Sequence, residues 1–166
     1  MDSFKSYLLR QAYKEVERLG DRLAEAEPLI DWEAFRPTLA SIYMNDGPQG
    51  GRPNTDPVLM VKMLVLQAWY GLSDPELERQ AADRISFRRF LGYPDVIPDA
   101  TTVWLLRERL AESGGDKAVW AELQRQLDEK GLTVKKGVAQ DASFITADPG
   151  GSGPRGDEEE PGRVVG

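Results

Sequence analysis

Few residue types in this chain could do chemistry, because its 166 residues include no histidine and no cysteine. Ser-His-Asp sites, thiolate metal sites and disulfides are therefore excluded within it. Catalysis would have to use carboxylates, lysine, tyrosine or serine, or a metal ion held by oxygen ligands. Asp141 is the main candidate, because apolar and β-compatible residues flank it in the run K-K-G-V-A-Q-D-A-S-F-I-T, residues 135–146. Its alternative role is a strand-end aspartate that starts a loop.

A second candidate group is the densest basic cluster, which consists of Arg79, Arg84, Arg88 and Arg89. These side chains could contact phosphate groups, or they could form a solvated face paired with neighbouring carboxylates. The surrounding segment, residues 52–112, contains 8 basic and 9 acidic residues, so it is not a basic module as a whole. Both interpretations stay open at this point.

Composition limits the class of protein. Hydrophobic residues make up 40% and charged residues 30%, which is typical of a globular chain. The net charge of −7 argues against a generally basic nucleic-acid binder but leaves room for a local basic face. The N-terminus lacks the pattern of a signal peptide, and the most apolar run, residues 58–70, is too short to span a bilayer. We expect a cytoplasmic protein that does not bind membranes.

The elements that must position these residues are mainly helices. Apolar spacing and capping residues predict helices over 4–27, 57–70, 74–84, 101–112 and 116–130. Asp56 and Pro57 suit the start of the second helix, which is apolar on nearly all sides and should be the buried centre of a bundle. Ser73 and Glu76 fit a capping box at the start of the third.

Apolar side chains suggest which helix faces point inward. In the first helix, the apolar positions at helical spacing are Leu8, Ala12, Val16, Leu19 and Leu23. The four tryptophans also fall on apolar faces, and we expect a core position for each. These residues are Trp32, Trp69, Trp104 and Trp120.

The pattern changes after Gly131. Residues 132–147 predict two short strands around the turn at residues 135–137, and the Gly- and Pro-rich tail, residues 148–166, predicts disorder. We therefore expect an N-terminal helical hairpin over 1–44, a helical domain over 45–131, one or two strands over 132–147 and a tail. The predicted fold class is mainly α, a helical bundle followed by a short β-hairpin.

Four motifs in order resemble insertion-sequence transposases of family five. They are G-R-P at 51–53, P-V-L-M-V-K-M-L-V-L-Q-A-W-Y at 57–70 with L-S-D-P-E-L-E at 72–78, P-D-A-T-T-V-W-L-L-R at 98–107, and G-V-A-Q-D-A-S-F-I at 137–145. Leu106 stands where an aromatic residue is usual. The matches span residues 51–147, and their order makes the signal more specific than any one motif.

The resemblance implies that a ribonuclease-H-like catalytic domain of the DDE type begins after residue 134. Asp141 would then be the first of three acidic residues that hold Mg²⁺ in the intact family site, where two metal ions promote strand cleavage and transfer. Here the only later carboxylates are Asp148 and the run at 157–160, which no apolar pattern positions. We therefore expect a truncated chain, inactive by itself, that binds no metal alone.

The resemblance also implies a DNA-binding role for the helical part. Helix 57–70, the Gly-Leu-Ser turn and helix 74–84 resemble a helix-turn-helix. The arginine cluster would then contact phosphates of the element's terminal inverted repeats, and Arg52 in the loop G-G-R-P could contact the DNA backbone. A plain turn residue is the alternative for Arg52.

The sequence thus predicts the N-terminal DNA-binding part of an insertion-sequence transposase, with DNA as the partner. A homodimer, or pairing with full-length transposase, is a further expectation. The competing hypotheses are a non-enzymatic regulator, a protein-interaction module that pairs through the first helix, and an inactive transposase remnant. Binding to terminal repeats would favour the first, and absence of DNA binding at low salt would favour the interaction module.

Overall fold

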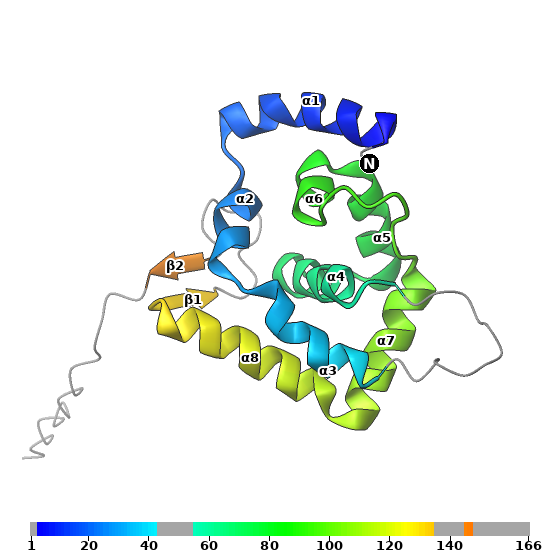
Figure 1. Cartoon of the computed structure of the whole chain (residues 1–166), viewed down its shortest axis with the longest axis vertical. Coiled ribbons are helices and arrows are strands. Elements are labelled where there is room, and N and C mark those ends of the chain that lie inside the picture. Colours follow the sequence, from blue (N-terminus) through cyan, green and yellow to red (C-terminus); the bar gives the residue numbers. More distant parts are fainter. Residues whose placement is uncertain (1–2, 43–54, 135–144, 148–166) are drawn as a thin grey trace, which may run out of the picture.

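The computed structural model describes residues 3–42, 55–134 and 145–147 (Figure 1). Its helices are α1 (Phe4–Leu19), α2 (Arg22–Ala26), η1 (Glu27–Leu29), η2 (Trp32–Phe35), α3 (Arg36–Ala40), α4 (Pro57–Tyr70), α5 (Asp74–Asp83), α6 (Ile85–Phe90), α7 (Ala100–Ser113) and α8 (Gly115–Glu129). Its strands are β1 (Leu132–Val134) and β2 (Ile145–Ala147). The predicted fold class, mainly helical with a short pair of strands, is confirmed.

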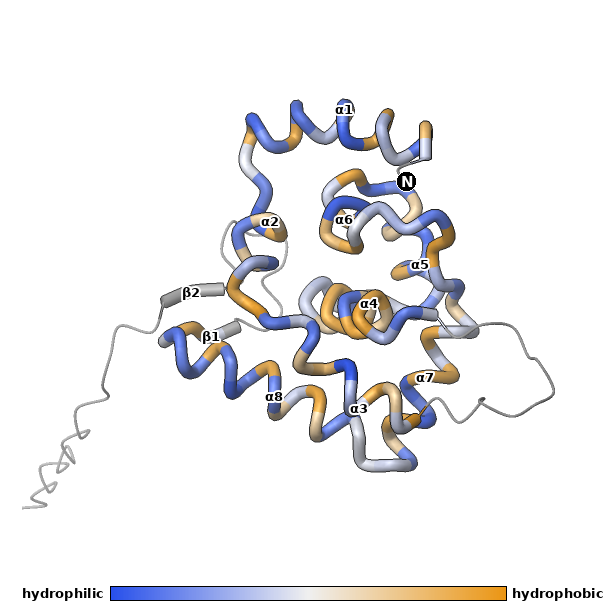
Figure 2. Tube along the Cα trace, in the orientation of Figure 1, coloured by the Kyte–Doolittle hydropathy of each residue, from blue (hydrophilic) through white to orange (hydrophobic). Residues whose placement is uncertain are grey.

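Helix α4 forms the centre of the fold. Every residue from Met60 to Leu66 is buried, and Figure 1 shows the other helices arranged around this helix. Figure 2 shows hydrophobic residues on several sides of α4, whereas hydrophobic and hydrophilic residues alternate along α1 and α8. The Asp56 side chain accepts a hydrogen bond from the Val58 N–H at 3.1 Å, and Gly71 ends the helix with φ of 63°, as the sequence predicts.

The surrounding helices bury aromatic and aliphatic side chains against α4. Trp32 meets Phe90 edge-on with ring centroids 5.4 Å apart, and Tyr70 meets Phe87 in the same manner at 4.9 Å. Such aromatic pairs add specific geometry to the hydrophobic burial that stabilises the core. The other fully buried large side chains include Leu23, Phe35, Leu39, Leu77, Leu110 and Leu127.

The turn between α4 and α5 contains only three residues, 71–73. Ser73 caps α5, because its hydroxyl accepts a hydrogen bond from the Glu76 N–H at 3.3 Å. The reciprocal half of the predicted capping box is absent among these contacts, since the Glu76 carboxylate instead accepts from Arg79 and Gln80. Arg79 lies one turn along the same helix face and offers that carboxylate a charged partner.

The first helix ends earlier than its apolar spacing predicts. Helix α1 stops at Gly20, whose φ is 97°, and the Asp21 side chain caps a separate helix α2 by accepting from the Leu23 N–H at 3.0 Å. The prediction of one helix over 4–27 is wrong here, because Gly20 and Asp21 supply a stop and a new start.

The inner face of α1 also differs from the predicted one. Ser6 and Tyr13 are buried, whereas Leu8 is 50% exposed and Leu19 is 72% exposed. The Tyr13 hydroxyl donates to the Asp21 carboxylate at 2.6 Å, and this bond fixes the rotation of α1. The face of α1 that contains Ser6 and Tyr13 packs on α6, and the more apolar side of α1 stays exposed.

The strands pair differently from the predicted hairpin. β1 and β2 are antiparallel, with Leu132 opposite Ala147 and Val134 opposite Ile145. The partner of β1 therefore begins at residue 145, further along the chain than a turn at 135–137 requires. Residues 135–144, and the tail from 148 for which disorder is predicted, lie outside the described residues.

Two of the four tryptophans are not core residues. Trp32 and Trp69 are buried, but Trp104 is 47% exposed and Trp120 is 39% exposed. The buried side chains of α7 are Val103, Leu106 and Leu110. The apolar residues of this helix cover a wider face than these three, so the sequence alone does not determine whether Trp104 points inward. In the part of the chain that the structure describes, no helix combines the length and apolar character that a membrane span requires.

Candidate nucleic-acid interface

The four clustered arginines lie on two consecutive helices that meet at a corner. Arg79 is on α5, Arg84 is the single residue between α5 and α6, and Arg88 and Arg89 are on α6. Because only one residue separates the helices, the four side chains share one region of the molecule. Arg52 and Asp141, the other predicted site residues, lie outside the described residues.

Arg79 is neutralised by a carboxylate on its own helix. Its Nε donates to the Glu76 Oε2 at 3.1 Å, and its Nη2 also contacts Glu76. Hydrogen bonds from Arg79 and then Gln80 lower the pKa of Glu76 to about 2, so this carboxylate stays ionised at neutral pH. The pair is exposed, and such surface pairs contribute little to stability.

Arg89 belongs to a partly buried ion-pair network around Glu27. Its Nη1 lies 3.3 Å from the Glu27 Oε2, and the Lys62 Nζ lies 3.1 Å from the other oxygen of Glu27. Lys62 is 8% exposed and also donates to the Phe90 carbonyl at 2.9 Å. These contacts fasten η1 to α4 and α6, so Arg89 has a structural role.

Arg84 and Arg88 make no ion pair with a described residue. The Arg84 guanidinium lies over the Phe87 ring at 4.5 Å and the Tyr70 ring at 5.2 Å, and its Nη1 donates to the Gln80 side chain at 3.3 Å. Cation–π contacts hold the charged group in place without neutralising it. Burial raises the pKa of the Tyr70 phenol, and the Arg84 charge partly opposes that shift.

Arg88 has unused hydrogen-bonding capacity. Its Nε donates to the Ala82 carbonyl at 3.2 Å, while its buried Nη1 finds no partner within the described structure. Buried donors are nearly always paired, so this Nη1 is an exception, and because it is buried it is not itself a contact for a phosphate group. The corner therefore presents two guanidinium groups whose charge no described carboxylate cancels.

The body of α5 does not share this basic character. It carries Asp74, Glu76, Glu78 and Asp83 against the single basic residue Arg79. A helix with this charge would be repelled by DNA phosphates if its whole length entered a groove. The structure thus divides the predicted cluster into two arginines paired with carboxylates and two, at the α5–α6 corner, without a carboxylate partner among the described residues.

An ion-pair network that the sequence analysis missed fixes the start of α5, at the end opposite to the α5–α6 corner, to the rest of the bundle. Arg107 on α7 makes two contacts to the Asp74 carboxylate, one of them at 2.9 Å through Nη2, and its Nη1 also donates to Gln67 at 3.0 Å. The hydrogen bond from Arg107 is the main cause that lowers the pKa of Asp74. No spacing rule connects residues so far apart in sequence, so only the fold reveals the pair.

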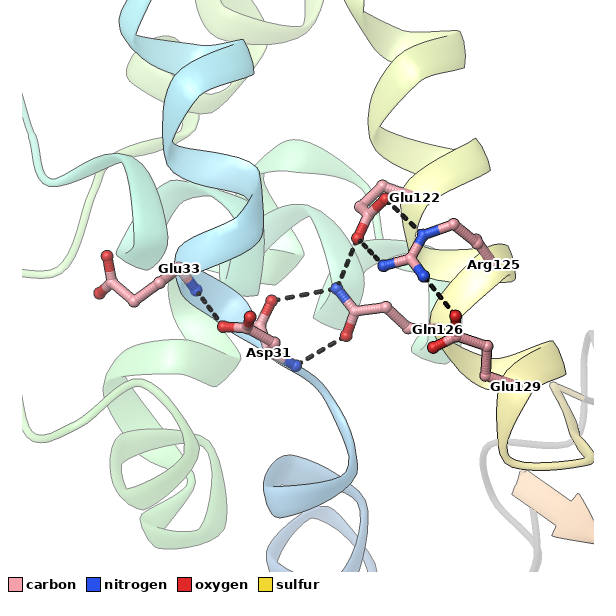
Figure 3. Close-up of polar contacts among 6 residues, drawn as sticks. All are labelled: Asp31, Glu33, Glu122, Arg125, Gln126 and Glu129. Atoms are coloured by element: carbon pink, nitrogen blue, oxygen red, sulfur yellow. Dashed lines mark hydrogen bonds and ion pairs between the residues drawn. The ribbon is translucent and has the colours of Figure 1, made fainter.

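A hollow of about 320 Å³ lies between the segment Pro28–Asp31 and the end of α8. The Gln126 side chain accepts from the Asp31 N–H at 2.7 Å and donates to the Asp31 carbonyl at 3.1 Å (Figure 3). Figure 3 also shows Arg125 held between Glu122 and Glu129, both at 2.7 Å. These polar groups satisfy one another, so we assign the hollow a structural role as the joint between α8 and η2.

The described residues contain no cluster of three or more acidic side chains that could hold a metal ion. The predicted Mg²⁺ site at Asp141 depends on residues outside them.

Comparison with known proteins gives the chain a family. The family model described as Transposase domain (DUF772) matches residues 10–109, which run from within α1 into α7 and include the α4–α5 turn and all four clustered arginines. No solved structure matches the chain. The family match covers more than half of the 166 residues and supports a role in transposition. The chain therefore belongs to the DUF772 transposase-domain family.

Proposed function

We propose that this chain is the DNA-binding part of an insertion-sequence transposase of family five and that it recognises the terminal inverted repeats of its element. Membership of the transposase-domain family supports interaction with DNA in general. The four ordered sequence motifs support the finer assignment to family five. The helix pair α4–α5 has a three-residue turn like that of a helix-turn-helix, but the carboxylates of α5 disfavour its use as the helix that enters the groove.

The observation that carries the proposal is the pair of arginines at the α5–α6 corner. Arg84 and Arg88 have no carboxylate partner among the described residues, and Arg84 is held over two aromatic rings. An ordered cation loses less conformational freedom when it binds, so it is a better phosphate contact than a free surface lysine. Two such contacts fix the register of the protein on a duplex, while other side chains read the bases.

DNA would approach the corner rather than the length of α5. The carboxylates of α5 disfavour a phosphate backbone along that helix, whereas Arg84 and Arg88 attract it at the end of the helix. Arg79 can add a third contact if it exchanges Glu76 for a phosphate, since their ion pair is exposed. Arg89 stays paired with Glu27 and keeps its structural role.

The catalytic part of the proposal rests on the motif around Asp141 alone. In the intact family site this aspartate would be one of three acidic ligands of Mg²⁺, which would supply activation of the attacking water or 3′-hydroxyl. One carboxylate does not hold two metal ions. We therefore expect no Mg²⁺-dependent nicking of repeat DNA by this chain alone, measured on supercoiled plasmid, and cleavage that disappears in Asp141→Ala would contradict this part.

The test of DNA binding compares two double variants of the chain. Replacing Arg84 and Arg88 by alanine should weaken binding to a fluorescent repeat duplex and reduce the slope of log K against log salt by about 2, one for each lost phosphate contact. The matched control replaces Arg18 on α1 and Arg125 on α8, which are exposed arginines paired with a carboxylate three residues earlier on their own helix. It should leave both the affinity and the slope near those of the wild type.

Equal losses in the two variants would contradict the assignment of the interface to the corner. Circular dichroism of both variants shows whether helix content is retained. Because Arg84 packs on Tyr70 and Phe87, Arg84→Lys and Arg88→Lys provide a milder pair that keeps charge but loses the planar group.

A further inference from the structure

The two arginines of the α5–α6 corner have no carboxylate partner in the part of the chain that the structure describes, although the chain as a whole is acidic, with a net charge of −7. Other arginines of the bundle, such as Arg36, Arg107 and Arg125, each pair with one or two carboxylates. Arg84 is an exposed residue and Arg88 is a partly exposed one. The corner therefore offers positive charge to an anionic group that the described residues do not supply.

The sequence contains one uninterrupted run of four carboxylates, D-E-E-E at residues 157–160, which we call the acidic run. The acidic run lies outside the described residues. Blocks of like charge commonly serve as binding segments for a surface of opposite charge. A carboxylate accepts two parallel hydrogen bonds from a guanidinium, and these charge-assisted bonds are stronger than neutral ones. The acidic run therefore has the chemistry that the corner requires of an anionic partner.

The acidic run is close enough along the chain to reach the corner. Strand β2 ends at Ala147, and an extended chain of about 3.3–3.6 Å per residue places Asp157 up to about 33–36 Å away and Glu160 up to about 43–47 Å away. Strand β1 packs on α8, the hollow joins the end of α8 to residues 28–31, and α2 packs on α6. Figure 1 shows β2 on the same side of the molecule as α2. At about 5 Å between paired strands and about 8–10 Å between packed elements, this path is about 30–35 Å long.

We propose that the acidic run binds Arg84 and Arg88 of its own chain and occupies the corner when no DNA is bound. Its consequence for DNA rests on the proposed function, because the acidic run then competes with phosphate groups for the same two guanidinium groups. Binding within one chain needs little intrinsic affinity, since a short tether gives an effective concentration in the millimolar range. The competition lowers the affinity for every duplex by the same factor, so it regulates binding without changing which sequence is preferred.

The corner suits the acidic run better than the exposed lysines of the described structure do. Lys5 and Lys14 on α1 and Lys130 after α8 are single cations on long, flexible side chains, and an ammonium group is strongly hydrated. Arg84 is already held over two aromatic rings, so it loses less conformational freedom when it binds a carboxylate. The carboxylates of α5 repel the acidic run from the length of that helix and leave only its end at the corner.

The first experiment detects the contact without DNA, on the full chain. A carbodiimide joins a carboxylate to an amine only where the two groups touch, so Arg84→Lys and Arg88→Lys provide an amine at the corner and keep its charge. Mass spectrometry should find the introduced lysine joined to a residue of the acidic run. Arg18→Lys is the matched control on α1 and should give no product with the acidic run, because Arg18 already pairs with Glu15.

An equal mixture of isotopically labelled and unlabelled chain shows whether the contact lies within one chain. Each cross-linked product should then contain a single isotope. Joining of the acidic run to Lys130 in place of the corner, equal joining in the Arg18→Lys control, or products of mixed isotope would overturn the proposal.

The second experiment measures the competition with DNA. Neutralising the acidic run by Asp157→Asn, Glu158→Gln, Glu159→Gln and Glu160→Gln should tighten binding to the repeat duplex on the order of tenfold. The same four changes in the Arg84→Ala, Arg88→Ala background should tighten it by about twofold or less, through the lower overall charge alone. Equal gains in the two backgrounds would overturn the competition. A chain that binds no duplex would contradict the proposed function, while the cross-link would still support the contact within the chain.

Discussion

At the scale of single residues, the partner of each arginine decides what that arginine can do. Arg79 and Arg89 belong to the same sequence cluster as Arg84 and Arg88, yet Glu76 and Glu27 neutralise the first two. The sequence could identify the cluster but not this division, because Glu27 reaches Arg89 from a distant segment of the chain. Lys62 shows the same limit, since a lysine in an apolar run is buried here only because Glu27 and the Phe90 carbonyl receive it.

Replacing Asp74 by asparagine should destabilise the chain by about 1–3 kcal/mol at pH 7, because Arg107 loses its charged partner at the start of α5. Arg107 keeps the pKa of Asp74 below its unfolded value. The stabilisation is therefore complete above an unfolded pKa of about 4, and it is lost as the pH falls through the lower folded value.

Urea denaturation at pH 7 and at pH values below 4 measures this effect. The free energies of unfolding of wild type and Asp74→Asn should converge as the pH falls. A difference that stays constant across this range would show that the Asp74 charge is not the cause.

At the scale of elements, capping residues were more informative than apolar spacing. Asp56 and Ser73 begin helices as predicted, and their side chains accept backbone N–H groups two or three residues on. Asp99 caps α7 in the same way by accepting from the Thr102 N–H. Spacing alone misplaced the inner face of α1 and the end of that helix. Apolar side chains occur on more than one face of α1, so their periodicity does not determine which face is buried. In the structure the buried face is the one that contains Tyr13, which bonds to Asp21.

Helix α8 is attached to η2 through Gln126, and this joint gives a prediction for the element. Gln126→Ala should cost about 1–2 kcal/mol of stability, because both backbone groups of Asp31 lose their side-chain partner. Gln124→Ala is the matched control, since Gln124 is exposed on the same helix and bonds only to Asp128 among described residues. The control should change stability by less than about 0.5 kcal/mol.

Thermal or urea denaturation of the two glutamine variants makes the comparison. Equal effects would mean that the loss arises from helix propensity rather than from the joint.

At the scale of the whole molecule, the helical bundle around α4 could be predicted because composition, caps and an all-round apolar helix agree. The arrangement of its surface could not be predicted, because exposure of Phe4, Trp104 and Trp120 depends on how helices rotate against each other. The contact of Arg107 with Asp74 and Gln67 likewise depends on the packing of three helices. These long-range contacts hold the start of α5 against α4 and α7.

The most direct test measures affinity of the wild-type chain for a duplex of its element's terminal repeat and for a shuffled duplex of equal length and composition, both at about 0.15 M salt. The proposed recognition predicts tighter binding to the repeat by about a thousandfold or more, as for other specific DNA-binding proteins. Equal affinities for the two duplexes, or no binding to either at low salt, would contradict recognition of the inverted repeats by this chain.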